Sequence, residues 1–248
     1  MQKWEKALLQ FLKKYENKPY FEGALLCGSY ATGNQNEFSD IDVHILISDT
    51  QNWRERGMVR TDGFLIEYFI NPIKKIKQEF RDDYSDGGNA SANMFGYGKI
   101  LFDKNGNVKK LKQEALRFLK KTPKKITPQK LALDFYGAWD LMDELKCAIA
   151  EKRGFDLVYY ELVKKLLTIH FKLNGIAKIS LAKTEKILSN PKFAKQYHIQ
   201  KLPDQKFTKL FLSALQNKKQ NAIQKLFNFV MTESDEFDIG QFKSKIKI

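Results

Sequence analysis

The stretch of sequence that decides the fold covers residues 25–47 and reads LLCGSYATGNQNEFSDIDVHILI. An apolar run ends at Cys27, Gly28 and Ser29 then form a sharp turn, and Gly33 permits a second tight approach of the backbone. Gly28 lets the chain come close to a phosphate because it has no Cβ. Ser29 adds a hydroxyl donor beside the backbone N–H groups of a helix start, where anions bind well. The pattern therefore indicates an anion-binding turn that follows a strand.

An acidic pair stands at the start of the next apolar run. Asp40 and Asp42 flank a single isoleucine, and residues 41–47 have the composition of a strand. Side chains two residues apart on a strand share a face, so both carboxylates point the same way. Two carboxylates this close repel each other unless a cation lies between them. A hard divalent ion such as Mg²⁺, which binds carboxylates and substrate phosphates, meets that requirement.

A third carboxylate is the only charge in the apolar run of residues 64–70, FLIEYFI. A continuous apolar run is typical of a strand that is buried on both faces. Placing Glu67 in such a strand is unfavourable unless the carboxylate is paired or bound to a metal. If this strand lies beside the strand of Asp40 and Asp42, the three carboxylates form the metal site of a two-metal displacement at phosphorus.

Together these residues resemble the signature of the nucleotidyltransferase superfamily, which includes DNA polymerase beta and the antibiotic nucleotidyltransferases. The signature is a Gly-Ser pair, a Gly four residues after the Ser, a carboxylate-x-carboxylate pair and a third carboxylate on a later strand. Its members here are Gly28, Ser29, Gly33, Asp40, Asp42 and Glu67. The resemblance covers roughly residues 20–105, including a closing strand at 98–103. The helical part that follows is similar in architecture only to the aminoglycoside and lincosamide nucleotidyltransferases.

The resemblance implies an enzyme that binds a nucleoside triphosphate with two Mg²⁺ ions. It would transfer a nucleoside monophosphate, AMP from ATP in the first instance, to a hydroxyl group and release pyrophosphate. Gly28 and Ser29 would hold the β- and γ-phosphates. Asp40 and Asp42 would bind both metals. Glu67 would bind the metal that activates the acceptor oxygen, and it is also a candidate general base.

Hydrophobic periodicity predicts an α+β fold, with strands and helices mixed in the first part of the chain and helices alone in the second. The resemblance implies that the first part is a mixed-sheet nucleotidyltransferase domain, which is followed by an all-α helical bundle domain. The expected helices of the first part span 2–16 and 73–80, and its strands span 23–27, 41–47, 64–70 and 99–102. The later part is expected to be helical at 108–121, 128–151, 156–174, 181–188, 205–217 and 219–231. The predicted domains are a catalytic domain at 1–105, a basic helix and connection at 106–127 and a helical domain at 128–248.

The charge and the cysteine content bear on the partners of the protein and on its location in the cell. Residues 1–103 carry 13 basic and 15 acidic side chains, whereas residues 104–248 carry 30 and 14, and nearly all of this basic charge is Lys. Lys lacks the planar fork with which Arg recognises phosphates, so a solvated surface explains much of the excess. The two cysteines have no metal or redox spacing, and no apolar run is long enough to cross a membrane. We therefore expect a cytoplasmic protein with no membrane contact.

The acceptor is less clear from the sequence, and three classes remain open. The domain order favours a small, antibiotic-like hydroxyl compound. The basic C-terminal part leaves RNA as a second acceptor. A third alternative is a non-catalytic nucleotide-binding protein, such as the partner of a toxin. The oligomeric state is not predicted.

Some further residues are weaker candidates. Asp140, Asp143 and Glu144 lie opposite the apolar stripe of the 128–151 helix, where they form either a solvated surface or a wall for a cationic acceptor that also supplies a base. His44 shares the strand parity of the acidic pair, but we expect a histidine with satisfied hydrogen bonds rather than a site residue. Lys183 is a weak candidate for a contact to the triphosphate.

Overall fold

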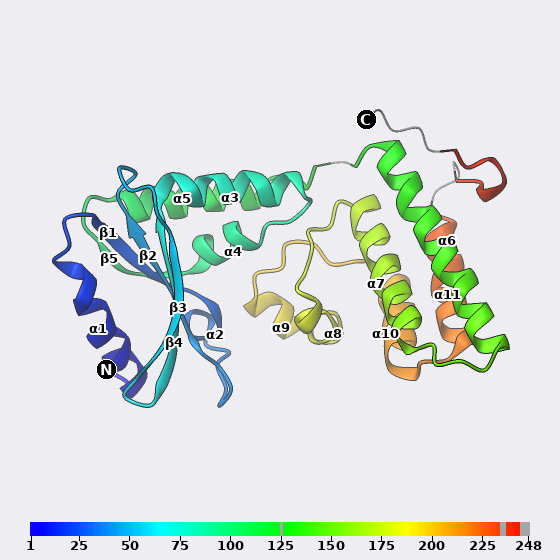
Figure 1. Ribbon diagram of the computed structural model, residues 1–248, viewed down its shortest axis with the longest axis horizontal. Helices are drawn as coiled ribbons and strands as arrows, with labels where there is room; N and C mark the ends of the chain where they lie inside the picture. Colours follow the sequence, from blue (N-terminus) through cyan, green and yellow to red (C-terminus); the bar gives the residue numbers. More distant parts are fainter. Residues whose placement is uncertain (125, 234–236, 244–248) are drawn as a thin grey trace. The chain divides into compact units, whose positions relative to one another are not determined.

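The computed structural model describes residues 1–124, 126–233 and 237–243 (Figure 1). The chain divides into two compact units, Met1–Lys121 with Lys195–Gln200, and Thr122–Ala194 with Lys201–Ile248. The predicted domain limits stay a prediction. Within the described ranges, no helix is both long enough and apolar enough to span a bilayer. The predicted fold class is confirmed, because a mixed sheet with helices is followed by a helical region.

The first unit is built around a five-stranded sheet with the order β3-β4-β2-β1-β5. Its strands are β1 (Phe21–Leu26), β2 (Ile41–Ile47), β3 (Glu55–Thr61), β4 (Phe64–Pro72) and β5 (Lys99–Asp103). Its helices are α1 (Lys3–Glu16), α2 (Gly28–Thr32), α3 (Ile73–Ser85), α4 (Ala90–Tyr97) and α5 (Asn107–Leu119). β2 and β4 are parallel neighbours, whereas the other neighbouring strands are antiparallel. The strands that carry Asp42 and Glu67 are therefore neighbours, which is the condition that the predicted metal site requires.

Helices cover the two faces of this sheet (Figure 1). Leu8, Phe11 and Leu12 of α1 pack with Val43 and Ile45 of β2 on one face. On the other face, α3, α4 and α5 surround apolar side chains from β1 and β2, among which are Leu25 and Leu46. The first helix, which the sequence predicts at 2–16, therefore packs on the sheet. Because β2 alternates between these two faces, its odd-numbered residues belong to the first core and its even-numbered residues to the other side.

One strand and two short helices were not predicted: β3, α4 and α9 (Pro191–Gln196). β3 is an edge strand with charged side chains, a composition that protects an exposed edge from aggregation but hides the strand in a hydrophobicity pattern. A two-residue turn at Asp62 and Gly63, both with positive φ, joins it to β4. An Asp-Gly pair before an apolar run is a strong hairpin signal, so the sequence did contain the information.

The second unit is helical. Its helices are α6 (Pro128–Ala150), α7 (Asp156–Leu173), α8 (Leu181–Ser189), α9 up to Ala194, α10 (Gln205–Asn217) and α11 (Gln220–Met231), with a short 3₁₀ turn at Ile239–Gln241. The predicted apolar stripe of α6 is confirmed at Phe135, Ala138, Met142 and Leu145, which are buried in one core. The hydroxyl of Tyr159 lies in that core and donates to the carbonyl of Ala214 at 2.7 Å. No strand follows β5 in the part of the chain that the structure describes.

A short segment from late in the sequence, residues 195–200, belongs to the first unit. The ring of His198 stacks on Tyr97 of α4 with a centroid distance of 3.6 Å. The amide of Asn93 donates to the carbonyl of Tyr197 at 3.3 Å. These contacts fix the segment to α4, one of the helices that cover the sheet.

Candidate active site

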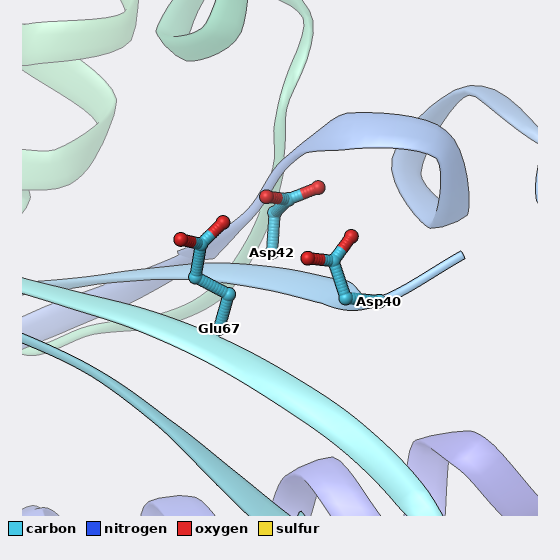
Figure 2. Close-up of side chains that lie close together, drawn as sticks. All are labelled: Asp40, Asp42 and Glu67. Atoms are coloured by element: carbon cyan, nitrogen blue, oxygen red, sulfur yellow. The ribbon is translucent and has the colours of Figure 1, made fainter. Parts of the chain in front are cut away.

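The three predicted carboxylates meet at one point of the sheet. Asp42 lies on β2 and Glu67 lies opposite it in the parallel register with β4, while Asp40 directly precedes β2. One oxygen of each carboxylate can be chosen so that all lie within 4.8 Å of one another, and all three residues are half-buried. Figure 2 shows the three carboxylates turned toward one another. We call Asp40, Asp42 and Glu67 the acidic triad.

The Gly-Ser turn lies directly beside the triad. Gly28 begins α2 with a φ of 63°, and the amide of Cys27 donates to the backbone carbonyl of Asp42 at 2.8 Å. A Cβ at position 28 would overlap the carboxylate of Asp42. The structure thus requires glycine here for two reasons that sequence reasoning did not give, namely the backbone angle and the space of a triad residue. Gly33 ends α2 in the left-handed conformation, and its amide donates to the carbonyl of Ser29.

Glu67 has a partner that the sequence reasoning missed. The guanidinium of Arg56, on β3, donates to Oε1 of Glu67 through Nη2 at 2.6 Å and through Nε at 3.0 Å. The same guanidinium lies over the ring of Phe69, 4.9 Å from its centroid. The expectation that a strand carboxylate at this position needs a partner is therefore confirmed. The hairpin signal at Asp62 and Gly63 would have placed β3 beside Glu67 and made Arg56 a candidate.

His44 differs from its prediction. Its side chain is only 6% exposed and stacks on Phe69 at 4.7 Å between ring centroids. Neither ring nitrogen has a hydrogen-bond partner within the described residues. The prediction that the hydrogen bonds of His44 are satisfied is therefore wrong. Burial, and in second place the charge of Arg54, lower the pKa of His44 to about 4, which keeps the imidazole neutral at pH 7. A buried and unpaired imidazole is unfavourable in a core and needs an explanation.

The remaining candidates lie in the second unit. Asp140, Asp143 and Glu144 are exposed on α6, as the solvated-surface interpretation expects, and Glu144 pairs with Arg153 at 2.8 Å. Lys183 is exposed in the first turn of α8. None of these four residues is part of the acidic triad. Their predicted roles toward an acceptor or a triphosphate stay predictions.

Comparison with known proteins shows which family the residues of this site resemble. Residues 7–107 match the family model "Polymerase beta, Nucleotidyltransferase", which covers the sheet, the Gly-Ser turn and the acidic triad. Residues 7–107 therefore form a domain of the nucleotidyltransferase superfamily, and the predicted superfamily is confirmed. The match supports a transferase of nucleotidyl groups. No curated protein sequence matches the chain.

Comparison with solved structures gives a match to the crystal structure of a nucleotidyltransferase-like protein from Exiguobacterium sibiricum. The match covers 91% of this chain and 75% of that protein, with 11% sequence identity and a TM-score of 0.43.

Proposed function

We propose that the protein is a Mg²⁺-dependent nucleotidyltransferase that moves AMP from ATP to a hydroxyl group of a small, antibiotic-like molecule. The observation that carries the proposal is the convergence of Asp40, Asp42 and Glu67 beside the Gly28 turn. A sheet that needed only stability would not place three carboxylates at one point, because their mutual repulsion is unfavourable. The family model supports nucleotidyl transfer, and the nucleotide base and the acceptor are our inference.

The triad fits a divalent cation. It offers only carboxylate oxygens within 4.8 Å of one another, and hard oxygen donors are the ligands that Mg²⁺ prefers. Asp40 and Asp42 would hold both ions and Glu67 one of them. Bound Mg²⁺ would neutralise charge on the phosphates and lower the pKa of the acceptor hydroxyl.

The chain's own residues would orient the substrates and move one proton. The turn of Gly28 and Ser29 would hold the β- and γ-phosphates, through backbone amides and the Ser29 hydroxyl. The acceptor oxygen forms a bond to the α-phosphorus while the bond from that phosphorus to the bridging oxygen breaks, and pyrophosphate leaves. The hydroxyl proton passes to a base, for which Glu67 is the first candidate and Asp140, Asp143 or Glu144 are alternatives.

The test is a transfer assay with the full chain, Mg²⁺ and each of the four α-labelled nucleoside triphosphates. The acceptor panel contains aminoglycosides, lincosamides, RNA and protein. We expect label from ATP on a small hydroxyl compound, and none with Asp42→Asn. Label on RNA alone, or the absence of any transfer while the wild type is folded, would contradict the proposal.

RNA is the second candidate acceptor, because the basic excess of residues 104–248 could bind phosphates. The lysines that would carry this binding are Lys109, Lys110, Lys112, Lys120, Lys121, Lys124 and Lys125, and Lys125 lies outside the described residues. Two of them have other contacts: Lys112 donates to the carbonyl of Gly98, and Lys121 lies 4.0 Å from the ring centroid of Phe118. An RNA acceptor predicts that log K falls with log salt by about 0.7 to 0.9 per phosphate contact.

A triple change of Asp140, Asp143 and Glu144 to their amides separates the two acceptors. A small acceptor that is cationic should lose affinity in this variant, and RNA binding should respond only to replacement of the lysines, whereas an uncharged small acceptor should respond to neither change. The third alternative, a non-catalytic nucleotide-binding protein, predicts nucleotide binding without label transfer to any acceptor.

A further inference from the structure

The sheet face that bears the triad continues into a second set of side chains, one row further along the strands. In the first row Met58, Glu67 and Asp42 are neighbours across β3, β4 and β2. In the next row Arg56, Phe69 and His44 occupy the same positions. A strand rises about 3.3 Å per residue, so the two rows lie about 6.6 Å apart. This distance is within the reach of a small molecule that contacts both rows.

A cavity of about 520 Å³ lies over the second row, and His44, Phe69 and Arg56 line it. Met94 of α4 and Glu79 of α3 line it from the helices that cover this face. The volume falls in the range that holds a drug-sized ligand. Arg56, which lines the cavity, also donates to Glu67 of the acidic triad, so this side chain links the two rows.

The charged groups of the cavity already have partners, and Glu55 among them accepts from the hydroxyl of Tyr68 at 2.7 Å. Arg54 donates to Oδ1 of the buried Asn71 and to Glu79, both at 2.5 Å, and Arg56 donates to Glu67. Within the part of the chain that is described, His44 is the buried side chain of this cavity whose polar atoms lack partners. A neutral imidazole offers one donor and one acceptor, and a hydroxyl group can satisfy either.

We propose that this cavity binds the acceptor and that the acceptor is an uncharged, hydroxyl-rich small molecule, such as a sugar or a cyclitol. One hydroxyl bonds to His44, and the hydroxyl that receives the nucleotide lies one row away at Glu67. The second statement, that the hydroxyl at Glu67 receives the nucleotide, rests on the proposed function. The lining contains two arginines and two glutamates, Arg54, Arg56, Glu55 and Glu79, so its formal charges cancel and a net charge on the ligand gains no advantage.

The first experiment measures binding to the full chain without nucleotide, by ligand-observed NMR. The probes are inositol and methyl glycosides, with 2-deoxystreptamine as a cationic probe and glucose 6-phosphate as an anionic one. We expect at least one uncharged probe to bind the wild type more tightly than the charged probes do. His44→Phe keeps the stacking on Phe69 but removes both polar atoms, and it should weaken this binding at least about tenfold. His44→Gln, which retains a donor and an acceptor, should keep part of it.

Two further variants test whether a loss of binding reflects only a loss of structure. Ile45→Val changes the adjacent core residue, which faces the opposite side of the sheet, and should leave probe binding unchanged. Met94→Trp fills the cavity from α4, at a side chain that is 38% exposed, and should abolish binding in a folded protein. No bound uncharged probe, preference for a charged one, or equal binding by His44→Phe and wild type would overturn the proposal.

The transfer assay separates this inference from the proposed function. Asp42→Asn should still bind the probes, because Asp42 belongs to the first row. If the probes bind through His44 but accept no label, the cavity is real and the proposed function fails. If label reaches an acceptor whose KM is the same in His44→Phe and wild type, the function stands and the cavity is not its acceptor site.

Discussion

The two faces of the sheet in the first unit differ sharply although they are formed by the same strands. Toward α1, Val43, Ile45, Ile66 and Ile70 are at most 1% exposed, and all are aliphatic. On the opposite face the intervening residues of β2 and β4 include Asp42, His44, Glu67 and Asn71. Both faces are largely covered, so burial alone does not separate them. Their difference lies in the chemistry of the buried groups.

This contrast indicates that alternate residues of the same strands have different roles. Residues on one face stabilise the sheet, and residues on the other face carry the polar groups of the candidate site. Aliphatic burial on the α1 face stabilises the sheet, at about 25 cal/mol per Å² of apolar surface removed from water. The polar face works against this, because clustered carboxylates repel and an unpaired imidazole loses its hydration. Natural proteins keep such groups where function requires them. Substitutions on the two faces should therefore have separable effects.

The largest expected effect is on the polar face. Asp42→Asn removes a triad carboxylate, and transfer should fall by about a thousandfold or more, since metal binding contributes several kcal/mol to such reactions. The melting temperature without metal should stay the same or rise, because repulsion within the triad decreases. Labelled-nucleotide turnover and thermal melts measure the two quantities. Asp62→Asn, a carboxylate change in the β3–β4 turn where Asn is well tolerated, is the matched control. Appreciable turnover by folded Asp42→Asn would remove the basis for a metal site.

The next effect belongs to the apolar face. Ile45→Ala should lower the free energy of unfolding by about 2 to 5 kcal/mol, because it leaves a cavity in a core with no exposed surface at this position. Nucleotide affinity of the folded fraction should not change. The free energy of unfolding is measured by urea unfolding of proteins that also carry Trp139→Phe. The remaining tryptophans, Trp4 and Trp53, then report on the first unit alone. Equal losses of stability and nucleotide affinity would show that the two faces are not independent.

The triad could be predicted from the sequence because its residues lie at short, fixed spacings on apolar strands. Asp40 and Asp42 share a face by parity, and Glu67 is the only charge in its run. Arg56 could not be found in the same way, since β3 has no apolar alternation and its importance comes from pairing with β4. The state of His44 depends on what α3 and α4 place above it, which strand parity does not contain. The docking of residues 195–200 on α4 is likewise a long-range contact without a local signal.

A smaller effect is expected at the turn beside the triad. Ser29→Ala removes one hydroxyl donor and should weaken triphosphate binding by about 1.5 to 3 kcal/mol, the range for a hydrogen bond to a charged group. Titration calorimetry with a non-hydrolysable triphosphate in the presence of Mg²⁺ measures it. Ser39→Ala, a loop serine whose hydroxyl contacts Asn36, serves as the control. If Ser29→Ala binds the triphosphate as tightly as Ser39→Ala does, the turn does not contact the phosphates through this hydroxyl.

The smallest effect concerns Arg56, which links the triad to the cavity on the same face. Its side chain is 69% exposed, so Arg56→Met should change the free energy of unfolding by no more than about 1 kcal/mol. The guanidinium occupies Oε1 of Glu67, an atom that a bound cation would also need. Its removal should therefore strengthen Mn²⁺ or Mg²⁺ binding by a few-fold, as the charge of Arg56 no longer opposes the cation. Mn²⁺ binding followed by electron paramagnetic resonance measures this, with Arg60→Met as a control that removes an exposed arginine from the same strand. Weaker cation binding in Arg56→Met than in Arg60→Met would mean that Arg56 holds Glu67 in position for the metal instead of competing with it.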